Sequence, residues 1–92
     1  MLKIRTSGGM IELDDREAAE LRERLRRLPA AQPAEETIAV AANASTSVAF
    51  TQVQVAAVLE VLDQWAEEAG EHGLGAGLLE LSRALRGELL AE

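Results

Sequence analysis

Apolar and polar residues alternate at the start of the chain and indicate two short β-strands. In the stretch LKIRTSGGMIELD, a two-residue turn at Gly8-Gly9 sets Ile4 opposite Leu13 and Arg5 opposite Glu12. Apolar side chains then share one face of the hairpin, and opposite charges share the other. A shift of one residue would move every side chain to the wrong face, so the pattern favours this register. We therefore predict a hairpin that turns at Gly8-Gly9.

A helical spacing of apolar residues follows the hairpin directly. Asp14 is suited to cap this helix, and Glu17, three residues later, completes a capping box. Pro29 marks the end of the helix. Residues 29–36, PAAQPAEE, have the composition and length of a loop. The apolar stripe of the helix consists of Ala18, Leu21, Leu25 and Leu28.

The second half of the chain repeats this pattern. Residues 48–65 align with residues 11–28 at a constant offset and without a gap, so that strand phase, helix cap and helix stripe agree together. Thr51 and Gln54 form the second capping box. Trp65 closes the second stripe, and we expect it to be buried for that reason. Two copies are too few for a solenoid and favour one pseudo-symmetric domain.

The repeat leads to a prediction of the whole fold. The strand that pairs with residues 48–50 is expected at residues 37–42, across a loop at residues 43–45. The most economical assembly is an α+β domain, in which a duplicated β-hairpin-helix unit (ββαββα) forms a four-stranded antiparallel sheet with helices on one face, plus a C-terminal helix. The predicted boundaries are one domain at 1–92, pseudo-repeats at 2–28 and 37–69, and the C-terminal helix at 77–91.

Composition excludes several classes of protein. The chain has no cysteine, which excludes disulfides, thiolate metal sites and cysteine nucleophiles. No apolar run reaches the roughly eighteen residues of a membrane span, and the first residues do not have the pattern of a signal peptide. We therefore expect a cytoplasmic protein without a membrane partner. Its net charge of −7 repels phosphate backbones, so no nucleic-acid partner is expected.

Charged residues are distributed unevenly along the chain. Residues 1–28 carry seven basic and six acidic groups, whereas residues 29–92 carry two basic and ten acidic groups. Four arginines cluster within residues 22–27, but Glu20 and Glu23 neutralise them and no aromatic residue accompanies them for base stacking. An acidic protein surface is their more natural target, such as the acidic run of residues 60–71 in another copy.

No pattern of residues indicates catalysis or a cofactor. His72 is the only histidine, it lacks the spacing of a triad, and one imidazole does not make a metal site. The acidic run lacks the spacing of a calcium loop and is more simply a solvated face. Residues 73–77, GLGAG, resemble a phosphate cradle only superficially, because no strand precedes them and the Gly-Lys-Ser/Thr ending is missing. We predict a protein that is not an enzyme and binds no cofactor or metal.

Small apolar residues in the second half replace charges found in the first. Alanines of the second hairpin stand where the first carries lysine, arginine and acidic residues, and the second helix replaces Arg16, Glu20 and Arg24 by apolar residues. Such surfaces commonly mark contacts, although scattered exposed valines need no explanation. The C-terminal helix or a partner subunit is expected to cover the sheet face. The candidate interface consists of Val53, Ala57, Val61, Ala39, Ala41 and Ala49.

These features favour a non-catalytic protein-interaction or scaffold module that acts as a homo-oligomer, most simply a homodimer. The alternative is a small-ligand-binding regulatory domain. Its site would lie between the sheet and the glycine-rich connection that precedes the C-terminal helix. This connection contains Gly70, Gly73, Gly75 and Gly77. A small enzyme is the third hypothesis. Another protein could take the place of the second copy as the partner.

Overall fold

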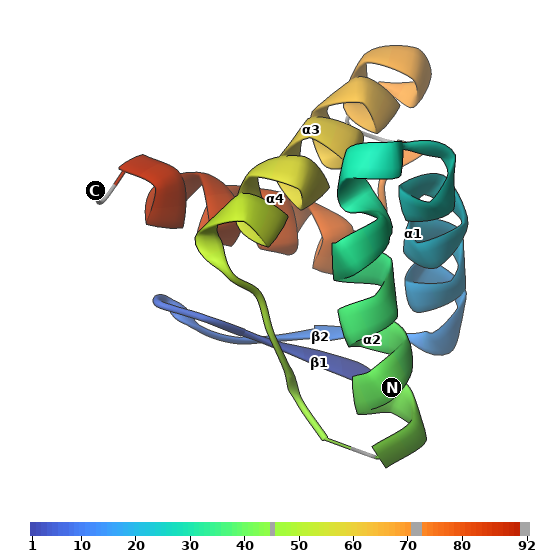
Figure 1. Ribbon diagram of the computed structural model, residues 1–92. Helices are drawn as coiled ribbons and strands as arrows, with labels where there is room; N and C mark the ends of the chain where they lie inside the picture. The colour runs from blue at the N-terminus through green and yellow to red at the C-terminus, as the bar shows by residue number, and fades with distance from the viewer. Residues whose placement is uncertain (45, 71–72, 91–92) are drawn as a thin grey trace.

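The computed structural model describes residues 1–44, 46–70 and 73–90, which form a small sheet with helices on one side of it (Figure 1). The chain begins with a hairpin and continues through helical segments, adds one more strand to the sheet, and ends with two long helices. The elements are β1 (Leu2–Thr6), β2 (Gly9–Leu13), α1 (Asp15–Arg27), the 3-10 helix η1 (Pro29–Ala31), α2 (Gln32–Ala44), β3 (Val48–Ala49), α3 (Gln52–Ala69) and α4 (Ala76–Leu90).

The sheet has three strands in the order β2-β1-β3. Strands β1 and β2 are antiparallel, whereas β3 pairs with β1 in parallel through Ile4↔Val48 and Arg5↔Ala49. The prediction of a four-stranded antiparallel sheet is therefore wrong, and so is the duplicated ββαββα unit behind it. The two halves share only the segment from strand to capped helix.

Residues 37–42, expected to be a strand, lie within helix α2. Ala34, Ile38 and Ala41 are buried at helical spacing. The apolar residues that suggested a strand therefore belong in part to the buried stripe of a helix. Alanine, which makes up half of residues 37–42, favours helix over strand, as do Glu35 and Glu36 just before them. Pro33 lies in the first helical turn, where proline is tolerated, and the predicted loop at residues 29–36 is instead η1 and the start of α2.

The first hairpin forms, but its register differs by two residues from the prediction. Ile4 pairs with Ile11 and Lys3 with Glu12, so the turn lies at Ser7-Gly8. Gly9 has a φ of 125°, which a residue with a side chain rarely adopts. A shift of two residues keeps apolar and charged pairs on their respective faces, which explains why the alternation of the sequence could not separate the two registers.

Both predicted capping boxes are confirmed, at Asp14/Glu17 on α1 and at Thr51/Gln54 on α3. Trp65 is also confirmed as buried, with 4% of its surface exposed. The core consists mainly of leucine, isoleucine, valine and alanine from every element. Its largest fully buried members are Ile4, Leu13, Leu21, Leu25, Ile38, Leu62, Leu78, Leu81 and Leu85.

Helix α4 packs against α3 and β2, on the side of the sheet that the other helices occupy. It does not cover the outward face of the sheet, contrary to one of the two expectations for that face. Lys3, Arg5, Met10, Glu12 and Ala49 on this outward face are exposed. In the described part of the chain, no helix is long and apolar enough to cross a membrane, while the cytoplasmic location stays a prediction.

Candidate functional site

The structure separates the six residues of the candidate interface. Ala39 and Ala41 belong to helix α2 and not to a sheet face. Ala57 and Val61 are buried at 6% and 5% exposure, so they contact the chain's own interior. The reason is that α3 is the central helix, with α4 on one side and α1, η1 and α2 on others. The surface positions that remain are Ala49, Val53 and, half-buried, Ala39.

An open groove of about 480 Å³ lies between α2 and β3, and we call it the α2–β3 groove. Val40 forms part of its α2 wall and is 68% exposed. Val53, which is 77% exposed, lies one residue before the groove residue Gln54. Of the described residues that line the groove, Glu36 alone is charged. The full lining is Pro33, Glu36, Thr37, Val40, Ala41, Thr46, Ser47, Val48, Ala49 and Gln54.

The backbone of β3 gives this groove an unpaired strand edge. On one side β3 is bonded to β1, and on its other side it pairs with no strand among the described residues. Edge strands present N–H and C=O groups to which another extended chain can bond.

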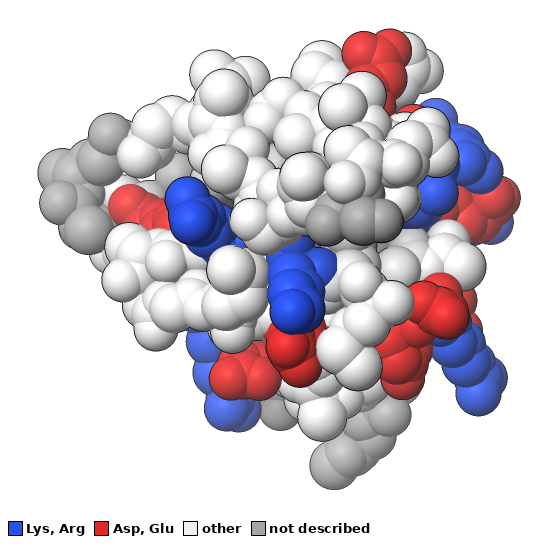
Figure 2. Space-filling view, turned by 90° about the horizontal axis from the view of Figure 1, so that it is seen from below, with Lys and Arg blue, Asp and Glu red and all other residues white. Residues whose placement is uncertain are grey.

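In Figure 2, the face seen from below carries few charged side chains in the middle of its upper half, where α2 and the segment after it come forward in Figure 1.

A second hollow, also of about 480 Å³, lies between α1 and α2 over the first residues of β1, and we call it the α1–α2 cleft. It shares Ala41, Thr46 and Ser47 with the α2–β3 groove, so the two hollows adjoin. Alanine dominates its helical walls, and a few polar groups surround them. The full lining is Met1, Leu2, Lys3, Asp15, Ala18, Ala19, Arg22, Ile38, Ala41, Ala42, Thr46 and Ser47.

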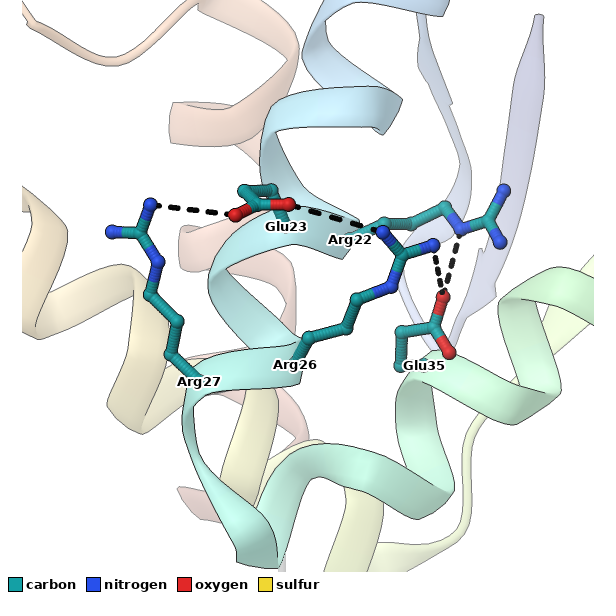
Figure 3. A network of polar contacts seen from close by, with 5 residues as sticks. All are labelled: Arg22, Glu23, Arg26, Arg27 and Glu35. Carbon is teal, nitrogen blue, oxygen red and sulfur yellow. Dashed lines mark hydrogen bonds and ion pairs between the residues drawn. The ribbon is translucent and has the colours of Figure 1, made fainter.

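Two arginines of α1 meet one glutamate of α2 beside this cleft (Figure 3). The Nε atom of Arg22 donates to Glu35 Oε1 at 3.0 Å, and an Nη atom of Arg26 lies 3.2 Å from the same oxygen. The Glu35 side chain is only 14% exposed, so this contact is well shielded from water. The sequence did not reveal it, because Glu35 lies in a stretch that was expected to be a loop.

The remaining arginines of α1 are also used within the chain. Arg24 donates to Glu68 of α3 at 2.7 Å, and its guanidinium lies 4.4 Å from the centre of the Trp65 ring. Asp63, another member of the acidic run, accepts a hydrogen bond from Arg86 of α4 at 2.6 Å. The pairing of basic α1 with the acidic run, which the sequence suggested between copies, thus occurs inside one chain.

The glycine-rich connection encloses a carboxylate of the protein itself. Oε2 of Glu17 accepts hydrogen bonds from the backbone N–H groups of Gly77 and Leu78. Gly75 lies so close to the same carboxylate that a Cβ atom there would collide with it. An internal anion therefore occupies the place that a phosphate would take at these two N–H groups.

His72 and Glu71 lie outside the described residues, as does Ser45 in the loop after α2. Among the residues that the structure does describe, no three acidic or histidine side chains come together as metal ligands. No known protein family, curated protein or solved structure gives a match to this chain. The two adjoining hollows are thus the best candidates for a functional site.

Proposed function

We propose that this protein is a non-catalytic protein-interaction module and that the α2–β3 groove is its contact surface. The observation that carries the proposal is the exposure of Val40 in the groove wall, together with the free edge of β3 that lines the same groove. An exposed apolar side chain in a hollow beside an unpaired strand edge favours a contact with an extended chain. The surface replaces the six-residue candidate interface, of which Ala41 and Ala49 line the groove and Val53 directly precedes the lining residue Gln54.

The partner that fits this groove is an extended protein segment with apolar and basic residues. The backbone of the segment would form hydrogen bonds with the free edge of β3. Every second side chain of an extended segment points to the same side, and one of these would pack between Val40 and Ala49. Glu36 at the groove and the net charge of −7 attract basic residues. A second copy carries the same negative charge, which makes the homodimer the less favourable form of the same hypothesis.

A peptide library displayed on phage tests the proposal. We expect selection against the wild-type protein to enrich peptides that combine apolar residues with lysine or arginine. Binding of these peptides should be lost in Val40→Glu, because a carboxylate would stand in the apolar wall. Leu90→Glu is the matched control, since Leu90 is an exposed apolar residue on α4, at 80% exposure, and it does not line the groove.

Two results would contradict the proposal. Either the selected peptides bind Val40→Glu as well as they bind the wild type, or no peptide is enriched above a selection without protein. Light scattering at tens of micromolar decides the form of the contact. A dimer that Val40→Glu dissociates, and Leu90→Glu does not, would make a second copy the partner.

A further inference from the structure

We propose that the α1–α2 cleft is a separate binding site, and that it takes a small organic anion with a carboxylate group and a compact apolar body. The proposal does not depend on the interaction surface, although the two hollows adjoin. It rests on the orientation of Arg22, on the charges around the cleft and on its apolar walls.

Arg22 presents a carboxylate-binding group to the cleft. Its Nε atom is held by Glu35, which fixes the plane of the guanidinium. Figure 3 shows the two terminal nitrogens turned away from Glu35, toward the strands. Neither terminal nitrogen is hydrogen-bonded to another of the described residues. Two parallel N–H groups of one guanidinium match the two oxygens of a carboxylate, so this end of Arg22 is suited to a bidentate contact.

The charges at the cleft differ in sign from those of the whole chain. Arg22 lines it, and Arg22 shares the Glu35 carboxylate with Arg26, so that these three groups together carry one positive charge. The one carboxylate among the described lining residues, Asp15, is paired with the Met1 amino group at 3.0 Å. The cleft is thus locally positive on a protein whose net charge is −7. An anion is therefore favoured over a neutral or cationic ligand of the same shape. The hydroxyl groups of Thr46 and Ser47 are further possible donors.

The walls of the cleft determine the size and the apolar character of the rest of the ligand. They are made chiefly of alanine methyl groups and Ile38, which provide apolar contact and leave room because the side chains are short. The volume of about 480 Å³ lies within the roughly 300–1,000 Å³ usual for small-molecule sites. A polar end with donors and an apolar floor together favour an amphipathic carboxylate over an inorganic anion.

Sodium benzoate is a suitable probe, with benzamide as the neutral molecule of nearly the same shape. We expect benzoate to shift the backbone amide signals of Ala18, Ala41 and Thr46 in two-dimensional NMR spectra, and to do so saturably. Benzamide should leave these signals nearly unchanged at the same concentration. Equal effects of the two molecules, or shifts that never saturate, would overturn the proposal.

Substitutions identify the group that binds the carboxylate. Arg22→Gln should weaken benzoate binding about tenfold or more, as expected for the loss of hydrogen bonds to a charged group. Arg27→Gln is the matched control on the same helix, because Arg27 pairs with Glu23 and does not line the cleft. Unchanged affinity in Arg22→Gln would contradict the assignment.

A second variant covers the case in which Arg22→Gln fails to fold. Ala19 lines the cleft and is exposed, so Ala19→Leu fills the space without removing a charge or a core contact. We expect this variant to fold and to lose benzoate binding. If Ala19→Leu binds benzoate like the wild type, the anion does not lie in this cleft.

Discussion

The Oε2 atom of Glu17 lies 3.1 Å from the backbone nitrogen of Gly77, so one side chain serves the first turns of two helices. Its other oxygen accepts a hydrogen bond from the N–H of Asp14 at 3.3 Å and completes the capping box of α1. The first N–H groups of a helix have no partner within the helix, and the positive end of the helix dipole favours an anion there. Glu17 therefore joins the beginning of α1 to the beginning of α4.

Glu17→Ala should lower the free energy of unfolding by about 2 kcal/mol, because it removes acceptors at two helix starts at once. Urea unfolding followed by circular dichroism measures this change. Hydrogen exchange should also become faster at the amides of Gly77 and Leu78. The control is Glu20→Ala, whose exposed pair with Arg16 contributes at most about 0.5 kcal/mol. If Glu17→Ala and Glu20→Ala lower the free energy of unfolding equally, the hydrogen bonds of Glu17 at the two helix starts contribute nothing to stability.

Gly77→Ala should destabilise the protein although alanine favours helix more than glycine does. A Cβ atom at this position would lie 2.9 Å from the backbone oxygen of Glu12 and 3.0 Å from Glu17. Gly87 lies in the same helix, and nothing is within 4 Å of a Cβ added there. Gly87→Ala should therefore stabilise the protein by about 0.5–1 kcal/mol. Thermal unfolding of both variants checks the pair, and a stabilising Gly77→Ala would contradict the close packing of α4 on β2.

Trp65→Ala should cost about 3–5 kcal/mol, because it removes a large side chain that is only 4% exposed. A loss of this size can unfold much of a chain this small. In the wild type, the fluorescence of Trp65 should be that of an indole shielded from water, and it should shift to longer wavelength on unfolding. Native emission like that of free indole would contradict its burial.

Val61→Glu should strongly destabilise the protein, because Val61 is only 5% exposed and a carboxylate there loses its contact with water. Arg24 and Arg27 line the same small hollow and offset only part of that cost. Val61 is a member of the candidate interface predicted from the sequence, but its burial means that this variant cannot report on association. Val53→Glu, on the same helix at an exposed position, should leave the circular dichroism spectrum unchanged. A Val61→Glu variant as stable as the wild type would show that α3 is less enclosed than the structure has it.

Local patterns of the sequence were sufficient for α1, α3, their caps and the burial of Trp65. These features depend on residues three or four positions apart, whose side-chain chemistry is specific. Residues 37–42 were misread because Ile38, Val40 and Ala42 alternate with other residues and also fit part of a helical stripe. The misreading then supported a false repeat, since a helix cap and an apolar stripe recur in many unrelated helices.

The candidate sites could not be derived in the same way. The α2–β3 groove exists because residues 37–42 are helical, so the wrong secondary structure hid it. The contact of Arg22 with Glu35 joins two helices, and no local spacing indicates that a guanidinium will be oriented by a residue of another element. The apolar residues that replace charges on α3 were real features of the sequence. Tertiary packing of α3 explains Ala57 and Val61 without a partner, whereas Val53 stays exposed.

Strand β3 has a consequence for the order in which the protein folds. Its two residues join β1 only after α1, η1 and α2 have been traversed, whereas β2 joins β1 through a tight turn. The entropy lost on closing a loop grows with its length, and a two-residue strand offers few bonds to offset that loss. We expect the hairpin to form early, and β3 to attach late, when α2 is already in place. The same imbalance makes β3 the strand whose amides should exchange first with solvent under native conditions, so that the strand that lines the α2–β3 groove is also the least stable part of the sheet.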